Sequence, residues 1–404
     1  MKIAVPRETA DGETRVALTP ATAAQLVAER VEVLVQAGAG EGSFIRDEEY
    51  REAGATIVPD APSLYSQADM VLRVGRPSDE EIEMLRSGTV LIGTLGTLSN
   101  PKLADRLAKA GVTAISMDAI PRITRAQSMD SLSSQSTVGG YKAVLIAAER
   151  LPKFFPLLTT AAGTVRPARV LVFGAGVAGL MAIGTARRLG AVVEATDVRP
   201  VVKEQVQSLG GTFLEVEMTD EEKAQAETAG GYAREMSEDY KRRQAELIAS
   251  RVGDADAVIT TALIPGRPAP RLITEEMVKT MRPGSVIVDM AAEAGGNCEL
   301  TEAGKEVVKH GVRIIGLTNL PATMPAHASQ MYAKNVQTLV KHLVRDGNLA
   351  LDFDDEITRG ATITHGGKVI NEPTAKALGI EPATPSAPVK TDASAATAGE
   401  RTGA

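Results

Sequence analysis

The chain has 404 residues, of which 44% are hydrophobic and 24% are charged, and its formal net charge is −7 at pH 7. This composition is typical of a globular protein with two or three domains, and the acidic balance argues against nucleic-acid binding, which demands a basic face. A single cysteine, Cys298, excludes an internal disulfide framework and favours a reducing, cytosolic compartment.

The sequence contains no candidate targeting segment, membrane span or metal site. Met1 leads directly into the strand-like residues 2–5, and no apolar run reaches the ~18 residues that a bilayer span needs. The four histidines lack the spacing of metal ligands: His310, His327, His342 and His365. We therefore expect no direct membrane insertion and no bound metal.

The N-terminal third of the chain alternates short β-rich runs with helical-looking segments, which predicts a parallel sheet. The runs are residues 2–5, 31–35, 56–58, 69–74, 89–93 and 112–116. Residues 131–151 then open with serines that can cap a helix and continue with an apolar face. We expect this helix to cross from a first domain to a second, with a cleft between the two domains.

A second series of strands follows the crossing helix, and it matches the six strands of a full doubly wound dinucleotide fold. The predicted strands are 169–174, 191–197, 212–216, 256–261, 285–289 and 313–317. The expected fold class is therefore α/β, with two Rossmann-like, doubly wound parallel-sheet domains separated by a cleft, and a disordered C-terminal tail.

The end of the chain is expected to return to the first domain. Residues 327–344 look helical and 349–370 look strand-like, whereas the composition after residue 380 shifts to Ala, Pro, Thr and Ser. The predicted units are a first α/β domain, a nucleotide-binding domain and a disordered tail. Their bounds are 1–130 completed by 325–379, then 131–324, then 380–404.

The stretch between the first two strands of the second series carries the pattern G-x-G-x-x-G. Gly174 permits a tight turn, Gly176 lets the backbone approach a pyrophosphate, and Gly179 lets the following helix pack closely on the strand. The helix N-terminus supplies anion binding without a basic side chain. Asp197, about 20 residues on, can accept both ribose hydroxyls of NAD and would repel the 2′-phosphate of NADP. The sequence therefore predicts NAD(H) binding.

A polar segment, residues 120–136, lies just before the crossing helix. Its polar side chains include Arg122, Arg125, Gln127, Asp130, Ser133 and Ser134. Its place at the interdomain cleft favours a binding site, and its composition is equally typical of a helix-capping segment with surface charges.

A long charged insertion, residues 217–246, stands where a short link would suffice. Gly230 and Gly231 offer a hinge and Tyr232 an aromatic cap, so the insertion is interpreted as a lid over bound nucleotide. The alternative is a solvated surface helix.

Several stretches of this chain are specific enough to indicate a family. They are AVPRETADGETRVALTP, PRITRAQSMDSLSSQS, VFGAGVAG, TALIPGRPAP and GSVIVDMAAEAGGNC. Over residues 1–370 the chain resembles the alanine dehydrogenase and nicotinamide nucleotide transhydrogenase family. Within that family, RAQSMDSLSSQS and ETAGGYAREM resemble the NAD(H)-binding component of proton-translocating transhydrogenases rather than alanine dehydrogenase.

The resemblance also separates the two branches by their chemistry. Alanine dehydrogenases use a lysine and a histidine to hold the substrate and move a proton, and the matching positions here are Gly75 and Gly96. Arg15 matches an arginine that contacts substrate in those enzymes, and it can equally form a structural ion pair. Asp289 and Glu293 lie where the dehydrogenases use an acid near the nicotinamide, and Glu293 is interpreted as a structural remnant.

Direct hydride transfer between two nicotinamides requires geometry rather than an acid or base. The resemblance implies that Arg122, Asp130 and Ser133 hydrogen-bond the carboxamide region, and that Gln127 reaches toward the partner's nucleotide. Tyr232 matches the aromatic residue of the mobile loop. Arg122, Gln127 and Asp130 form the expected catalytic set. The full expected cofactor-binding set is Arg122, Gln127, Asp130, Ser133, Gly174, Gly176, Val177, Gly179, Asp197, Val198, Arg199, Tyr232, Thr261, Ala262 and Leu263.

The same resemblance implies partners and a location. We expect a homodimer that works with a membrane-spanning subunit and with a subunit that binds NADP(H), so that NADP(H) is not bound on this chain. Such a chain is cytoplasmic and peripherally associated with the inner membrane, and its tail is a remnant of a linker. Two alternatives stay open: an NAD-dependent amino-acid dehydrogenase of the alanine type, and a non-catalytic NAD-sensing module.

Overall fold

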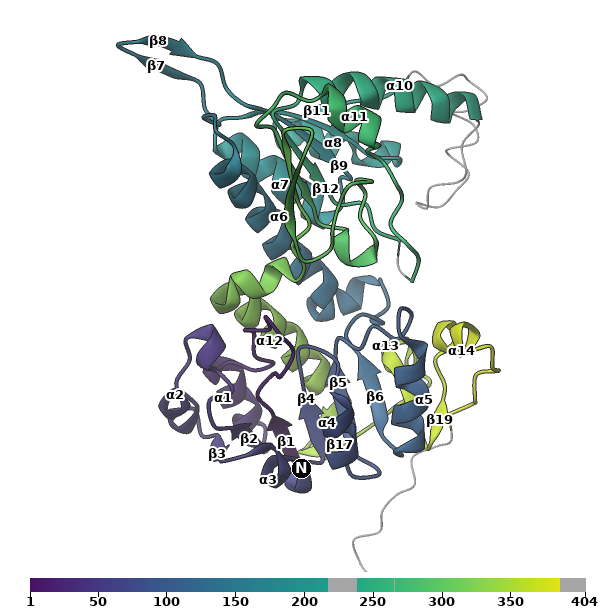
Figure 1. Ribbon diagram of the computed structural model, residues 1–404. Helices are drawn as coiled ribbons and strands as arrows, with labels where there is room; N and C mark the ends of the chain where they lie inside the picture. Colours follow the sequence, from purple (N-terminus) through teal and green to yellow (C-terminus); the bar gives the residue numbers. More distant parts are fainter. Residues whose placement is uncertain (217–237, 265, 386–404) are drawn as a thin grey trace, which may run out of the picture.

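The computed structural model describes residues 1–216, 238–264 and 266–385. Within these ranges the chain forms two α/β units, one beyond the other, joined by helices that run between them (Figure 1). The predicted lid residues Gly230, Gly231 and Tyr232 and the tail residues 386–404 lie outside the described residues. The prediction of two doubly wound parallel-sheet domains is confirmed, and where the boundary between them falls stays a prediction.

The first sheet has eight strands among the described residues, in the order β19-β18-β6-β5-β4-β1-β2-β3. Strands β1 to β6 are parallel, and β18 and β19 add an antiparallel edge. Each of the six predicted runs overlaps one of the parallel strands. The strands are β1 (Lys2–Val5), β2 (Glu32–Gln36), β3 (Thr56–Val58), β4 (Met70–Leu72), β5 (Val90–Gly93), β6 (Thr113–Ser116), β18 (Thr362–His365) and β19 (Lys368–Val369).

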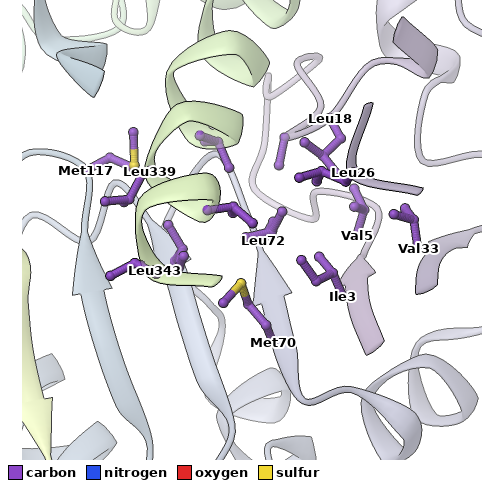
Figure 2. Packing of buried hydrophobic residues seen from close by; sticks show 14 of the residues in the cluster. Ile3, Val5, Leu18, Leu26, Val33, Met70, Leu72, Met117, Leu339 and Leu343 are labelled. Atoms are coloured by element: carbon purple, nitrogen blue, oxygen red, sulfur yellow. The ribbon is translucent and has the colours of Figure 1, made fainter. Parts of the chain in front are cut away.

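Short helices connect these strands, and a long helix from late in the chain covers one face of the sheet. Leu339 and Leu343 of that helix, α12, pack on Ile3, Met70 and Leu72 of the sheet in one buried core (Figure 2). This burial of apolar surface fixes the return of the chain onto the first sheet. The helices are α1 (Pro20–Ala28), α2 (Asp47–Glu52), α3 (Ala61–Gln67), α4 (Asp79–Met84), α5 (Pro101–Lys109), α12 (Pro325–Leu343) and α14 (Glu372–Leu378).

The expectation of strand throughout 349–370 was wrong in its middle. Residues Glu356–Ala361 form the helix α13, because the Asp355 carboxylate accepts hydrogen bonds from the amides of Ile357 and Thr358 at 2.8 and 3.1 Å. A side chain that caps a helix in this way satisfies amides that have no partner within the helix. The small ladder of β16 (Val344–Arg345) and β17 (Asn348–Leu349) comes just before it.

The second sheet has the order β11-β10-β9-β12-β13-β15-β14 within the described ranges. Its six parallel strands are those predicted, and the antiparallel edge strand β14 was missed because its sequence, EVVK, is short and largely exposed. A hairpin of β7 and β8 projects away from the body of the unit (Figure 1). The strands are β7 (Leu158–Thr160), β8 (Gly163–Val165), β9 (Arg169–Phe173), β10 (Val192–Thr196), β11 (Thr212–Phe213), β12 (Ala257–Thr260), β13 (Val286–Asp289), β14 (Glu306–Lys309) and β15 (Val312–Ile315).

The crossing helix α6 begins against the first domain and ends in the core of the second (Figure 1). It can pack tightly on α7 because a Cβ at Gly140 would lie 2.1 Å from the carbonyl oxygen of Ala178. Residues 238–246, the last part of the insertion interpreted as a lid, begin helix α10, which agrees with the alternative of a surface helix for these residues. The helices of this unit are α6 (Ser131–Arg150), α7 (Val177–Arg188), α8 (Lys203–Ser208), α10 (Glu238–Asp254) and α11 (Glu275–Thr280).

Both sheets reverse their strand order at an equivalent place, between β1 and β4 in the first and between β9 and β12 in the second. Such a switch point opens a crevice at the carboxyl ends of the strands, where ligands of doubly wound folds bind. No helix in the described portion of the chain combines the length and the apolar character needed to cross a bilayer. Short 3₁₀ helices complete the described part of the structure: η1 (Glu41–Ser43), η2 (Thr124–Met129), η3 (Pro200–Val202), η4 (Ala292–Ala294) and η5 (Leu320–Thr323).

Candidate nucleotide-binding site

The glycine turn, residues 174–179, joins β9 to α7 at the switch point of the second sheet. Gly174 has φ +90°, and a Cβ there would lie 2.6 Å from Thr261 Oγ1. A Cβ at Gly179 would lie 1.8 Å from the carbonyl oxygen of Gly174, so only glycine lets the helix start this close to the strand. At Gly176 the nearest atom is Arg199 Nη2 at 3.9 Å, which leaves the backbone there open to a ligand. Each predicted role thus has a matching local geometry.

The first turn of α7 offers amide groups to an anion. Gly176 is the N-cap, with extended backbone, and it has no side chain to satisfy the amides that follow. Val177, the first residue of the helix, is 42% exposed. Unpaired amides and the helix dipole together favour a phosphate at this position.

Asp197 follows β10 directly and faces the glycine turn. Its Oδ2 accepts the Ala175 amide at 2.7 Å and its Oδ1 accepts the Arg199 amide at 2.8 Å. The Arg199 guanidinium adds two hydrogen bonds of 2.9 Å, one to each oxygen. Burial raises the pKa of the Asp197 carboxyl, but these hydrogen bonds outweigh it, so the pKa lies below its usual range and the group is an anion at neutral pH.

A largely apolar hollow adjoins Asp197 between the end of β11 and helix α10. Its apolar lining comes from Val198, Phe213, Leu214, Val216, Tyr240, Leu247 and Ile248. Of these residues the sequence identified only Val198. The others come from the third strand, from the residues that follow it and from helix α10, which begins within the predicted insertion, and only the fold brings them beside Asp197.

The loop after β12 forms the other wall of the switch point. The Thr261 hydroxyl donates to the carbonyl oxygens of Phe173 and Gly174 at 3.0 and 3.2 Å, which ties this loop to the glycine turn. Asn297 was not predicted. It pairs with the backbone of Ala262 in both directions, at 3.1 and 2.9 Å. Leu263 follows and is 56% exposed. Asn297 therefore holds the loop, and Thr261 joins it to the turn.

Asp289 is a structural anchor rather than a free acid. Its side chain is buried and accepts the Thr260 and Thr301 hydroxyls at 2.9 and 2.6 Å and the Ala291 and Cys298 amides at 3.0 Å each. With its oxygens occupied in this way, it holds the end of β13 in place.

The polar segment, residues 120–136, spans η2 and the start of α6. Asp130 caps α6 by accepting the Ser133 amide at 2.9 Å and the Ser133 hydroxyl at 2.6 Å. Arg125 pairs with Asp355 at 2.6 Å, which fixes the segment to the first domain. The capping interpretation therefore holds for Asp130 and Ser133, which does not preclude ligand contacts through their remaining lone pairs.

Arg122 and Gln127 differ from their neighbours in this segment. Both side chains are exposed. Within the residues that the structure describes, neither side chain makes a hydrogen bond or an ion pair, although the Gln127 backbone carbonyl accepts the Asp130 amide at 3.2 Å. The segment lies on the order of 15 Å along α6 from the contact with α7, at 1.5 Å per residue from Asp130 to Gly140. The structure thus leaves Arg122 and Gln127 available for a ligand that extends from the glycine turn toward the first domain.

Arg15 belongs to a hydrogen-bonded group between the domains. It pairs with Glu13 at 2.6 Å, and its Nη1 and Nη2 donate to Gln135 at 2.9 Å and Asn319 at 3.0 Å. The backbone N–H of Asn319 donates to Glu293 Oε1 at 2.8 Å. Burial raises the pKa of Glu13, but its hydrogen bonds with Arg15 outweigh that effect and the pKa is lowered. Arg15 is therefore a structural ion-pair residue that links the domains.

A buried ionic cluster fills the first sheet near its switch point. The Arg73 side chain is fully buried and pairs with Glu8 at 2.9 Å and with Glu81. Glu8 also accepts the Val74 amide at 2.6 Å. A Cβ at Gly75 would lie 3.7 Å from the Glu8 carboxylate. The position of the dehydrogenase lysine thus lies beside an acid that already has a cationic partner.

Comparison with known proteins agrees with these features. Residues 4–139 match the family described as "Alanine dehydrogenase/PNT, N-terminal domain" and residues 143–372 match "Alanine dehydrogenase/PNT, C-terminal domain". The chain is 51% identical over 378 residues to an NAD(P) transhydrogenase subunit alpha chain of Rhodospirillum rubrum, covering 92% of this chain and 98% of that one.

The other branch of the family is more distant. Alanine dehydrogenase of Bacillus subtilis is 32% identical over 391 residues, covering 94% of this chain and 96% of that one. A crystal structure described as transhydrogenase from Sinorhizobium meliloti superposes with a TM-score of 0.84 at 46% identity, covering 92% of this chain and all of that one. The chain therefore belongs to the alanine dehydrogenase and transhydrogenase family, and within it is similar to transhydrogenase alpha subunits.

Proposed function

We propose that this chain is the NAD(H)-binding subunit of a proton-translocating transhydrogenase. NADH bound here would pass a hydride directly to NADP bound on a partner subunit. The observation that carries the proposal is the contrast between a complete dinucleotide cradle at the second switch point and the glycines at both dehydrogenase positions of the first domain.

In this proposal the residues around the second switch point bind the pyrophosphate and the adenosine ribose. Gly174, Gly176 and the first turn of α7 bind the pyrophosphate, and Gly179 makes their approach possible. Asp197 accepts the adenosine ribose hydroxyls beside Val198, and the loop Thr261, Ala262 and Leu263 covers the other side. Val177 and Arg199 border the same crevice. Tyr232, assigned to the closing loop, lies outside the described residues.

The polar segment orients the nicotinamide. Arg122 and Gln127 have free polar groups there, while Asp130 and Ser133 already support each other as a helix cap and would act through their remaining lone pairs. Transfer between two C4 atoms needs a separation of about 3–3.5 Å and exclusion of water, so these residues contribute by positioning.

The proposed assembly includes a membrane-spanning subunit and an NADP(H)-binding subunit, with this chain in the cytoplasm at the inner membrane. A homodimer of this chain belongs to the proposal. Its support is the hairpin β7–β8, which projects from the body and is flanked by Phe154 and Leu157, each 58% exposed. An isolated two-stranded hairpin is marginal in water and gains from a partner surface. Light scattering on the purified chain should give twice the monomer mass.

The experiment that tests the function mixes this chain with a purified NADP(H)-binding subunit from a transhydrogenase and follows reduction of thio-NADP by NADH. We expect transfer only in the mixture, because each subunit supplies one nucleotide. The chain alone should bind NADH and reduce neither NADP nor pyruvate with ammonium. Pyruvate-dependent oxidation of NADH by the pure chain would instead establish the amino-acid dehydrogenase.

A variant tests the role of Gln127 in the same assay. Gln127→Asn should leave the NADH affinity within about twofold and slow transfer in the mixture about tenfold or more, because a shorter side chain disturbs alignment more than ground-state binding. Ser128→Ala, at a neighbouring exposed position, is the control and should keep the normal rate. A normal rate for Gln127→Asn would remove Gln127 from the site.

A further inference from the structure

The Asp197 carboxylate has no lone pair left for a ligand in this structure. An ionised carboxylate offers about four acceptor positions, and four N–H groups occupy the Asp197 oxygens. A ribose that presents two hydroxyls to Asp197 therefore needs two of these donors to leave.

Two of the four N–H groups belong to the backbone and two to the Arg199 side chain, and only this side chain can move away from Asp197. The amides of Ala175 and Arg199 belong to the backbone of the glycine turn and of the residue two after Asp197, so the fold holds them. The Arg199 guanidinium supplies the other two bonds, and its side chain is 37% exposed, whereas that of Asp197 is 5% exposed. Within the described residues, the guanidinium makes no hydrogen bond or ion pair other than those with Asp197.

The guanidinium also lies at the edge of the phosphate-binding turn. Its Nη2 is the atom nearest to the position that a Cβ on Gly176 would take, at 3.9 Å. If the ribose lies between Asp197 and the glycine turn, a phosphate on its 2′-oxygen comes close to this cation, and the planar guanidinium can bind phosphate oxygens in pairs.

We propose that Arg199 determines the selectivity of this site between the two nicotinamide nucleotides. The inference rests on the proposed function, in which the nucleotide binds at the second switch point. With NADH, the guanidinium leaves Asp197 and the ribose hydroxyls take its place. With NADPH, the guanidinium follows the 2′-phosphate and offsets its repulsion by Asp197, so the discrimination against NADPH is smaller than Asp197 alone would impose.

Removing the guanidinium should therefore act on the two nucleotides in opposite directions. In Arg199→Ala the Asp197 oxygens stand free, so NADH should bind as tightly as before or more tightly. NADPH would meet an uncompensated carboxylate and bind more weakly. We expect the ratio of the NADPH and NADH dissociation constants to rise about tenfold, which corresponds to about 1.4 kcal/mol.

The test measures both dissociation constants by fluorescence titration of the full chain. Arg199→Lys keeps the charge without the paired donors and should give an intermediate ratio. The control is Arg188→Ala, an exposed arginine in the last turn of α7 that removes the same charge from the same domain and should leave the ratio unchanged.

The outcomes separate the two claims. A ratio that stays constant or falls in Arg199→Ala, with NADH still bound, overturns the role of Arg199 and leaves the proposed function intact. A wild-type chain that binds neither nucleotide overturns the proposed function and this inference with it.

Discussion

The six parallel strands have the same order in the two sheets of this protein, but different residues lie at the two switch points. In the second sheet, β9 passes to α7 through the glycine turn, whose backbone amides face the crevice. In the first sheet, residues 6–19 separate β1 from α1, and Glu8 from this stretch folds back onto Arg73. Strand order supplies a crevice in both cases, and the side chains decide whether a ligand or the protein itself occupies it.

The largest effect should come from breaking the ionic cluster in the first sheet. Arg73→Met leaves Glu8 and Glu81 buried without their cation, which costs about 3–5 kcal/mol of the free energy of unfolding. The NADH affinity should not change at temperatures where the variant is folded, because the cluster belongs to the other domain. Urea denaturation and calorimetry with NADH measure the two quantities. A variant as stable as the wild type would show that the cluster is not needed to fill the first switch point.

A side chain in the glycine turn of the second switch point should weaken NADH binding, whereas Arg73→Met should weaken only the stability. Gly179→Ala places a Cβ 1.8 Å from a backbone carbonyl, so the turn must shift and NADH should bind at least about a hundredfold more weakly, or about 2.7 kcal/mol.

Gly184→Ala on the same helix is the matched control for that variant. Its Cβ would meet nothing closer than Leu209 Cδ2 at 3.6 Å. It should keep the NADH affinity and raise the free energy of unfolding by up to about 1 kcal/mol, because alanine favours a helix. Equal calorimetric affinities for the two variants would contradict the proposed use of the glycine turn.

The acids of the two switch points should also differ in function. Asp197 faces the glycine turn, where we propose that the nucleotide binds. In the wild type NADH should therefore bind at least about tenfold more tightly than NADPH, or about 1.4 kcal/mol. Asp197→Asn should narrow this gap. Glu194→Gln, on the strand that precedes Asp197, removes the same charge and should leave the gap unchanged. Equal affinities of the wild type for both nucleotides would remove the assigned role of Asp197.

The smallest effect concerns the ion pair that fixes the polar segment to the first domain. Hydrogen bonds from the Thr358 and Ile357 amides and from Arg125 outweigh the effect of burial and lower the pKa of Asp355 to about 2. The stabilisation is complete above the ordinary pKa of 3.8 and is lost as the pH falls through about 2.

Asp355→Asn retains a good helix cap and loses the charge that pairs with Arg125, whose side chain is 55% exposed. At pH 7 it should therefore cost less than about 1 kcal/mol. Thermal unfolding at a series of pH values should show the difference between wild type and variant disappearing as the pH approaches about 2. A difference that persists there would mean that the charge of Asp355 is not its cause.

The parallel strands and the glycine roles could be predicted because they depend on local patterns. Alternating β-rich and helical segments and a G-x-G-x-x-G spacing are visible within about 30 residues of sequence. The edge strand β14 was not predicted because its residues are largely exposed and show no apolar pattern. Helix α13 was not predicted because its start depends on a single capping residue, Asp355.

The side-chain contacts at the two switch points could not be predicted in the same way. The pairing of Glu8 with Arg73 joins residues 65 positions apart, and the apolar hollow beside Asp197 combines β11 with α10. Even the short-range pair of Asp197 and Arg199 was hidden, because the sequence indicates an acid for the ribose and says nothing of the side chain that covers it.

The crossing helix α6 connects the two domains as one continuous helix. Its 20 residues span about 30 Å, with Ser131 held to the Met117 carbonyl in the first domain and Ile146 embedded in the core of the second. A bend of about 0.1 radian along such a rod displaces one end by about 3 Å relative to the other. In the proposed function, that displacement is as large as the separation of about 3–3.5 Å across which the hydride would pass. The stiffness of α6 would then set how precisely the two reacting carbons can be aligned.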